Sequence, residues 1–282
     1  MTQTSPSASR PQRSRRLLGA LDEALRPHEP IGRRTYLGGV SATAVLLALG
    51  WAGLTYSGLV QPLFLPSPSD VVRSAVALVH DGSLLIHARA SLTVILFGWA
   101  LAIVAAVPLG ILMGTFKLVE ALVEPIVNFV RYLPVSAMIP LLILYIGIGT
   151  AEKVAVIFIG TFFQLVLLVA DVSANVSKDL LDSAYTLGAK RRTVFTRVLV
   201  PATLPGVMDS LRITMGWAWT YLIVAELVSS DRGLGYLILD SMRGLFTDRI
   251  FVGLLTIGLL GLIFDQFFKW LHRVALPWSP KI

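Results

Sequence analysis

The chain has 282 residues, of which 55% are hydrophobic and 15% charged, and its mean hydropathy is +0.74. Soluble domains carry about 25% charged residues, so this composition excludes an ordinary soluble domain. The absence of cysteine excludes disulfides and thiolate metal sites, and the four histidines are scattered without pairing at i,i+4. The net charge of +7 has to be interpreted by position before it indicates any partner.

The first 35 residues are polar and rich in Ser, Pro and Arg, a composition that favours disorder. Residues 17–26 suit a short helix lying on the membrane surface. This segment has no apolar core followed by a small-residue cleavage site, so we do not expect a secretory signal. We expect a cytoplasmic N-terminal tail over 1–35, followed by a transmembrane domain over 36–282.

Long charge-free blocks mark the membrane-spanning segments. No Asp, Glu, Lys or Arg occurs in 35–69, 90–116 or 132–151. About 20 apolar residues at 1.5 Å each cross the hydrocarbon core of a bilayer. The sequence therefore predicts an all-α membrane protein with six transmembrane helices, which we place at 36–56, 91–115, 122–147, 153–172, 209–230 and 249–270.

The distribution of basic residues predicts the orientation of these spans. With a cytoplasmic N-terminus, the four inner segments hold 15 Lys and Arg residues, whereas the three outer segments hold four. The inner segments are 1–35, 116–121, 173–208 and 271–282, and the outer ones are 57–90, 148–152 and 231–248. Lys and Arg are retained on the cytoplasmic side. We therefore expect both termini inside, and no nucleic-acid partner is needed to explain the net charge.

The first outer loop contains a helix start. Ser67 followed by Pro68, with Asp70 in the first turn, predicts an N-terminus there, and the helix should run to about His80.

The second span carries small residues at strict four-residue spacing: Ala102, Ala106, Gly110 and Gly114. Such a face lets a neighbouring helix backbone approach closely. Pro108 lies in the same helix and is expected to bend it.

Charged groups are costly inside a membrane and are therefore functional candidates. The deepest are Arg131, Glu226 and Asp265, together with the polar Asn128 and Gln164. Arg131 precedes Pro134 and Pro140, which interrupt its helix; it could guide an anion along the pathway, form a salt bridge, or reach the inner interface. Glu226 could line the pathway or join two helices, and Asp265 and Lys269 at i,i+4 favour an ion pair.

No stretch of the sequence predicts a nucleotide-binding, catalytic or metal site. Gly110–Lys117 lacks the spacing of a phosphate-binding loop and lies in an apolar helix with no preceding strand. We find no set of nucleophile, base and orienting residue and no metal-ligand cluster. We therefore expect neither an enzyme nor a bound metal, and any ATP must be handled by a partner.

Residues 182–206 combine basic side chains with an apolar face. That face has four residues at helical spacing, Val194, Phe195, Val198 and Leu199. Gly188 predicts a break before this short helix, Pro201 should stop it, and Pro205 with Gly206 should turn the chain back to the membrane. The pattern alone fits a helix on anionic lipid or a helix docked in a protein groove.

The same segment resembles the coupling loop of permease subunits from bacterial ABC importers. The family signature is E-A-A-x3-G-x9-I-x-L-P. This chain has Asp182-Ser183-Ala184, Gly188 and Val198-Leu199-Val200-Pro201 at the same spacing. The departures are conservative, with Asp for Glu, Ser for Ala, and Val for both Ile and Leu.

Other stretches extend the resemblance from residue 62 to the C-terminus. RYLPVSAMIPLLILYIGIG resembles the family's R-x-x-P-x-x-A-x-x-P-L-x-x-L-x-x-G-x-G stretch. LPSPSDVV resembles its outer-loop L-P-S-P segment, and AELVSSDRGLGYLI resembles the segment between its last two spans. These matches are typical of the branch that imports nitrate, sulfonates, taurine and bicarbonate.

The resemblance implies a multi-pass protein of the bacterial inner membrane, surrounded by lipid. A second permease copy, most simply in a homodimer, would complete the pathway. Cytoplasmic ABC ATPase subunits would bind ATP, so no cofactor is expected in this chain. A periplasmic or lipid-anchored binding protein would deliver a small oxyanion such as nitrate, a sulfonate or taurine, or bicarbonate. Uncharged molecules like thiamine precursors remain an alternative substrate class.

The resemblance also assigns roles within the coupling loop, about 173–208. Gly188 would supply the bend, Ala184 and Leu187 would pack closely, and Val194, Phe195 and Val198 would form the face docked on the ATPase. The alternative function for the chain is that of a secondary transporter or channel without an ATPase partner. Such proteins usually have repeated halves, and we find no clear internal repeat in this sequence.

Overall fold

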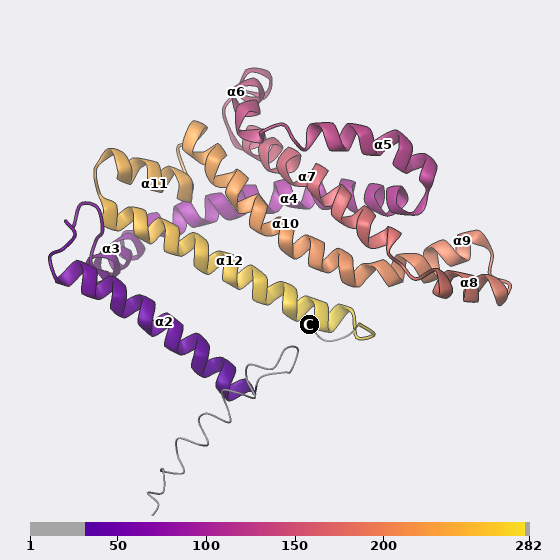
Figure 1. Ribbon diagram of the computed structural model, residues 1–282. Coiled ribbons are helices and arrows are strands. Elements are labelled where there is room, and N and C mark those ends of the chain that lie inside the picture. The colour runs from indigo at the N-terminus through magenta and orange to yellow at the C-terminus, as the bar shows by residue number, and fades with distance from the viewer. Residues whose placement is uncertain (1–31, 280–282) are drawn as a thin grey trace, which may run out of the picture. The chain divides into compact units, whose positions relative to one another are not determined.

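A computed structural model describes residues 32–279, and in this part of the chain every regular element is a helix (Figure 1). The chain divides into two compact units, 1–60 and 61–282. The surface helix expected at 17–26, and nearly all of the expected tail, lie outside the described residues. The all-α prediction is confirmed.

The first unit contains one described helix, α2 (Arg33–Tyr56), and none of its residues is buried. A helix that is apolar on all sides and uncovered by protein suits a lipid environment. It begins three residues before the predicted span and ends where predicted.

The second unit contains the remaining helices. In chain order they are α3 (Pro68–His80), α4 (Ser83–Thr115), α5 (Lys117–Val130), α6 (Val135–Ile146), α7 (Thr150–Ala174), α8 (Lys178–Thr186), α9 (Arg191–Val194), the π-helix η1 (Phe195–Leu199), α10 (Val200–Ser229), α11 (Leu234–Arg243) and α12 (Thr247–Ala275). α4 and α7 pack along each other most extensively, and α10 packs on α7 (Figure 1). The short helices α3 and α11 lie at one end of this bundle, and α8 and α9 lie at the other.

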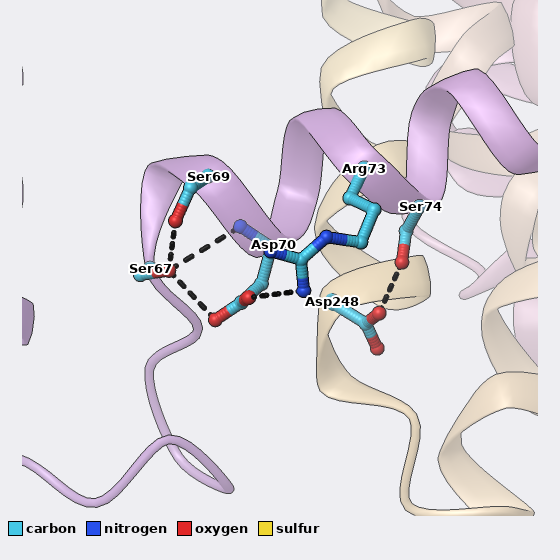
Figure 2. Close-up of polar contacts among 6 residues, drawn as sticks. All are labelled: Ser67, Ser69, Asp70, Arg73, Ser74 and Asp248. Atoms are coloured by element: carbon cyan, nitrogen blue, oxygen red, sulfur yellow. Dashed lines mark hydrogen bonds and ion pairs between the residues drawn. The ribbon is translucent and has the colours of Figure 1, made fainter.

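The predicted start of α3 is confirmed (Figure 2). The Ser67 hydroxyl accepts a hydrogen bond from the Asp70 backbone N–H at 3.3 Å, and Pro68 occupies the first turn, where its missing N–H costs nothing. The Ser67 hydroxyl also donates to the Asp70 carboxylate at 2.6 Å. Ser74 donates to Asp248, which ties α3 to the first turn of α12.

The predicted small-residue face of α4 is confirmed as the surface that packs on α7. Ala102 and Ala106 are fully buried. A Cβ added at Gly110 would lie 2.7 Å from the Val166 carbonyl oxygen, and one at Gly114 would lie 2.1 Å from that of Ala170. Since real Cβ atoms do not approach so closely, the contact between the two backbones requires glycine at both positions.

The predicted count of six spans is not confirmed as such. By length and composition, four helices of the described residues can cross a membrane, namely α2, α4, α7 and α12. α5 and α6 together can form a fifth span, bent by 93°. α10 is long enough at 30 residues, but charged residues such as Asp209, Arg212 and Glu226 make it less apolar.

The third predicted span, 122–147, is thus two helices rather than one. The break falls between Val130 and Val135, where Pro134 disfavours helical backbone at Leu133 and then precedes the first turn of α6. Pro140 lies inside α6 without ending it, which differs from the expected interruption.

Candidate functional site

The turn between α8 and α9 has the geometry that Gly188 predicts. Gly188 has a φ of +83°, in the left-handed region where glycine carries no steric penalty. Its N–H donates to the Tyr185 carbonyl at 2.9 Å, and the Ala189 N–H donates to the Ala184 carbonyl at 3.1 Å. This pair of bonds is the Schellman ending of a helix, so the motif glycine ends α8 and reverses the chain.

The chain after this turn differs from the prediction. Pro201 does not stop a short helix, and Pro205 and Gly206 do not turn the chain; all three lie within α10. Helical backbone continues from Arg191 to Ser229 through α9, η1 and α10. The reason is local: in η1 the Val200 N–H donates to the Phe195 carbonyl, five residues back, and the wider π turn places Pro201 in the first turn of α10, where no N–H is required.

The apolar face of this segment turns toward the chain's own core. Val194 is only 3% exposed, and Leu199 belongs to the core cluster formed by α4, α5, α7 and α10. The Phe195 ring stacks on Phe116 with centroids 5.6 Å apart. Val198 is half-buried. The face expected to dock on a partner is therefore largely occupied within this chain.

The exposed side of the segment is the tip of α8 and the turn that follows it. Leu187 is 88% exposed, and Leu180 and Tyr185 are also exposed. The motif residues Asp182 and Ser183 are exposed beside them, whereas Ala184 is half-buried. The basic residues Lys190, Arg191, Arg192 and Arg197 are exposed as well. This tip presents apolar and cationic groups together at one end of the bundle.

Arg131 lies at the break between α5 and α6. Its guanidinium donates to the Tyr132 hydroxyl at 3.0 Å and lies 4.7 Å from the centroid of that ring. Within residues 32–279 no carboxylate forms an ion pair with it, so the salt bridge, one of its three possible roles, is not observed. Asn128, one turn earlier, donates to Glu124 at 3.3 Å. Gln164 is half-buried on α7.

Glu226 joins three helices, which was one of its two expected roles. It is 1% exposed, and its carboxylate accepts hydrogen bonds from the Ser91 hydroxyl of α4 at 2.6 Å and from the Gly235 N–H of α11 at 2.7 Å. The Leu234 N–H donates to Ser91 at 2.8 Å, and the Gly233 N–H donates to Nδ1 of His87 at 3.1 Å. Side chains of α4 and α10 thus satisfy three N–H groups at the start of α11.

Asp265 forms the expected ion pair with Lys269, at 2.8 Å. It also pairs with Arg212 of α10, a partner that spacing along α12 could not reveal. Among the described residues no group of three His, Cys, Asp or Glu side chains could hold a metal ion.

These elements define a multi-pass helical membrane protein whose central helices carry an exposed turn at one end. The family of such proteins is identified by comparison. The model of the binding-protein-dependent transport system inner membrane component matches residues 106–275. The chain belongs to this family.

Three curated relatives show how far the similarity extends. A probable ABC transporter permease protein of Brucella abortus is 38% identical over 232 residues, 82% of this chain and 92% of the relative. The taurine transport system permease protein TauC of Escherichia coli is 30% identical over 258 residues, 90% and 93% of the two chains. The formylaminopyrimidine transport permease protein ThiX of Halalkalibacterium halodurans is 32% identical over 221 residues, which cover 78% of this chain and 88% of the relative.

A solved structure has the same fold. In an inward-facing form of the MetNI methionine ABC transporter, one chain superposes with a TM-score of 0.54 at 20% identity, covering 64% of this chain and 92% of that one. By its family and relatives, the protein is a membrane-spanning ABC transporter permease.

Proposed function

We propose that this chain is the permease subunit of an ATP-driven importer for a small sulfonate. A homodimer would form the pathway, ATPase subunits would bind in the cytoplasm, and a periplasmic or lipid-anchored binding protein would deliver the substrate. The observation that carries the proposal is the Schellman turn at Gly188, because it holds the exposed tip of α8 at one end of a permease fold. One relative is named as a taurine transport permease, and its match to this chain covers 93% of the relative's length. Taurine is a sulfonate, so this relative supports the sulfonate class.

Coupling would occur at that tip. Leu187, Tyr185 and Leu180 supply the apolar contact, and the basic residues around them suit an acidic rim on the ATPase. ATP binding would draw the two tips of the dimer together, and hydrolysis would release them. This can shift the permease between states only if the ATPase docks the tip with different affinity in each.

The buried residues of the motif have a different role in this proposal. Val194, Phe195 and Leu199 attach α9 and η1 to the bundle, so that movement of the tip would be transmitted to α10. A polar substitution at Phe195 would therefore disrupt the permease itself and would not test docking.

Leu187→Asp tests the docking directly. Leu187 is 88% exposed in this chain, so the substitution should leave insertion and stability unchanged. Loss of a central apolar anchor should lower ATPase co-purification and substrate-dependent ATP hydrolysis about tenfold or more. The matched control is Ser177→Asp, which adds the same charge at the exposed residue preceding α8, where Asp is a favourable N-cap. Full ATP-driven uptake by Leu187→Asp would refute the docking role.

The importer itself is tested by purifying the tagged chain from native membranes in mild detergent and identifying co-purifying proteins by mass spectrometry. We expect an ATPase with a phosphate-binding loop and a binding protein whose affinity for taurine, nitrate and a neutral pyrimidine can be measured. Absence of any ATPase would favour a secondary transporter or channel. A binding protein that prefers the pyrimidine would move the substrate toward that of the Halalkalibacterium halodurans relative.

A further inference from the structure

A cavity of about 450 Å³ lies where α4 and α7 begin and α10 ends. Its charged lining residues are Arg89 of α4, Lys153 of α7, Glu226 of α10, and Asp231 and Arg232 after α10. All of these residues belong to the second unit. The positive-inside rule places this end of the bundle on the outer side, where a binding protein would release its substrate.

Lys153 is the unusual member of this lining. It is only 6% exposed, yet within residues 32–279 no side chain forms a hydrogen bond or ion pair with its ammonium group. Glu152 and Glu226 interact with it electrostatically, but no carboxylate oxygen of either lies within 4.0 Å of its nitrogen, the distance of an ion pair. The ammonium nitrogen is not among the fully buried unpaired polar atoms of the described residues, and Lys153 lines the cavity. It is therefore open to a ligand, and an anionic oxygen there could form a charge-assisted hydrogen bond with it.

Of the three nearby carboxylates, Glu226 and Glu152 accept hydrogen bonds from other groups, and Asp231 lies beside Arg232. Oε1 of Glu152 is buried without a hydrogen-bond partner among the described residues. Both oxygens of Glu226 accept hydrogen bonds, from Ser91 and from the Gly235 N–H. Glu152 accepts from the Ser229 hydroxyl at 2.8 Å. The formal charges around the cavity balance, with Lys153, Arg89 and Arg232 against Glu152, Glu226 and Asp231. Arg89, however, has no ion-pair partner among the described residues, so its guanidinium is available to a ligand.

Two further features favour an anion. Arg232 is held loosely by Asp231, at 3.9 Å, and both side chains are largely exposed, so this guanidinium can turn toward a ligand. α7 begins at the cavity with no side chain capping its first turn, which leaves backbone N–H groups and the positive end of the helix dipole there.

From this arrangement we infer that the cavity is an oxyanion subsite in which Lys153 pairs with a single negatively charged oxyanion group and Arg89 and Arg232 enclose it from the open side. Resting on the proposed function, this group is the sulfonate of the incoming substrate. Lys153 is then the specificity-determining residue that distinguishes a sulfonate from a neutral ligand of the same size.

The subsite can be tested on the wild-type sequence, without a substitution. The full chain, purified with its ATPase in a phosphate-free maltoside detergent, is methylated at lysine with formaldehyde and borohydride, and each lysine is quantified by mass spectrometry. We expect methanesulfonate to protect Lys153 in a saturable manner, while neutral dimethyl sulfone does not. Lys178, exposed on α8, serves as the internal control and should be unprotected.

The outcomes are distinguishable. No protection by any anion overturns the subsite, and protection by added phosphatidylglycerol alone assigns the cavity to a lipid headgroup and also overturns it. Protection by nitrate but not by methanesulfonate supports the oxyanion subsite and contradicts only the sulfonate in the proposed function.

Transport by variants gives an independent measurement. In proteoliposomes with the complete transporter, Lys153→Gln should lower taurine uptake about tenfold or more, because it removes a charge-assisted contact. Lys153→Arg, which keeps the charge, should restore much of it. Arg243→Gln removes an exposed charge from α11 outside the cavity and should behave as wild type. Wild-type uptake by Lys153→Gln would overturn the inference.

Discussion

At the scale of single residues, polar groups in this protein hold helices together where lipid leaves them no other partner. Ser91 is the clearest case, because one hydroxyl donates to Glu226 and accepts from the Leu234 N–H. Glu226 is therefore better explained as the link between α4, α10 and α11 than as a free pathway charge. Sequence could not decide this, since its partner Ser91 lies 135 residues away.

Ser91→Ala should therefore be destabilising. It leaves a buried carboxylate oxygen and a buried backbone N–H without their partner, and each such loss typically costs about 1–3 kcal/mol. Thermal unfolding in detergent should show a clearly lowered midpoint. Thr43→Ala is the matched control, because the Thr43 hydroxyl is exposed and donates only to a carbonyl of its own helix. Equal midpoints for the two variants would show that the Ser91 contacts contribute little.

At the scale of elements, the contact between α4 and α7 depends on glycine. A Cβ at Gly114 would lie 2.1 Å from the Ala170 carbonyl oxygen, whereas one at Gly258 of α12 would meet no atom within 4 Å. Gly114→Ala should thus force the helices apart, with a cost of about 1–3 kcal/mol or more. Gly258→Ala should be neutral or slightly stabilising. The amount of folded protein recovered in detergent compares them, and equal recovery would contradict the close contact.

Among the helices and turns, the features that depend on neighbouring residues could be predicted from the sequence. The cap at Ser67, the small-residue face of α4 and the left-handed turn at Gly188 are local patterns, and each is confirmed. The helix end predicted at Pro201 was wrong, because the π turn before it places Pro201 in the first turn of α10, where no backbone N–H is required. The burial of Phe195 depends on Phe116, which is distant in sequence. Lys153 was placed at the start of a span, but only the folded chain brings it beside Arg89 and Arg232.

At the scale of the whole molecule, coupling and the oxyanion subsite require opposite ends of the second unit to face opposite sides of the membrane. α8 and α9 lie at one end and α3 and α11 at the other (Figure 1). The basic residues favour the α8 end as cytoplasmic. In the proposed function the ATPase would then act at the tip of α8 and substrate would enter beside Lys153. α7 and α10, which pack on each other, connect these two ends.

This orientation can be measured with single cysteines, because the natural chain has none and gives no background. Asn175→Cys lies just after α7 and Met242→Cys lies on α11, and both positions are exposed. In intact spheroplasts, a membrane-impermeant maleimide should label Met242→Cys at once and Asn175→Cys only after permeabilisation. The reverse pattern would place the α8 tip outside, where no cytoplasmic ATPase could reach it, and the proposed coupling would fail together with entry beside Lys153. Labelling of both without permeabilisation would mean that the segment between them does not cross the membrane, and α10 would then lose its role as the connection between the two sites.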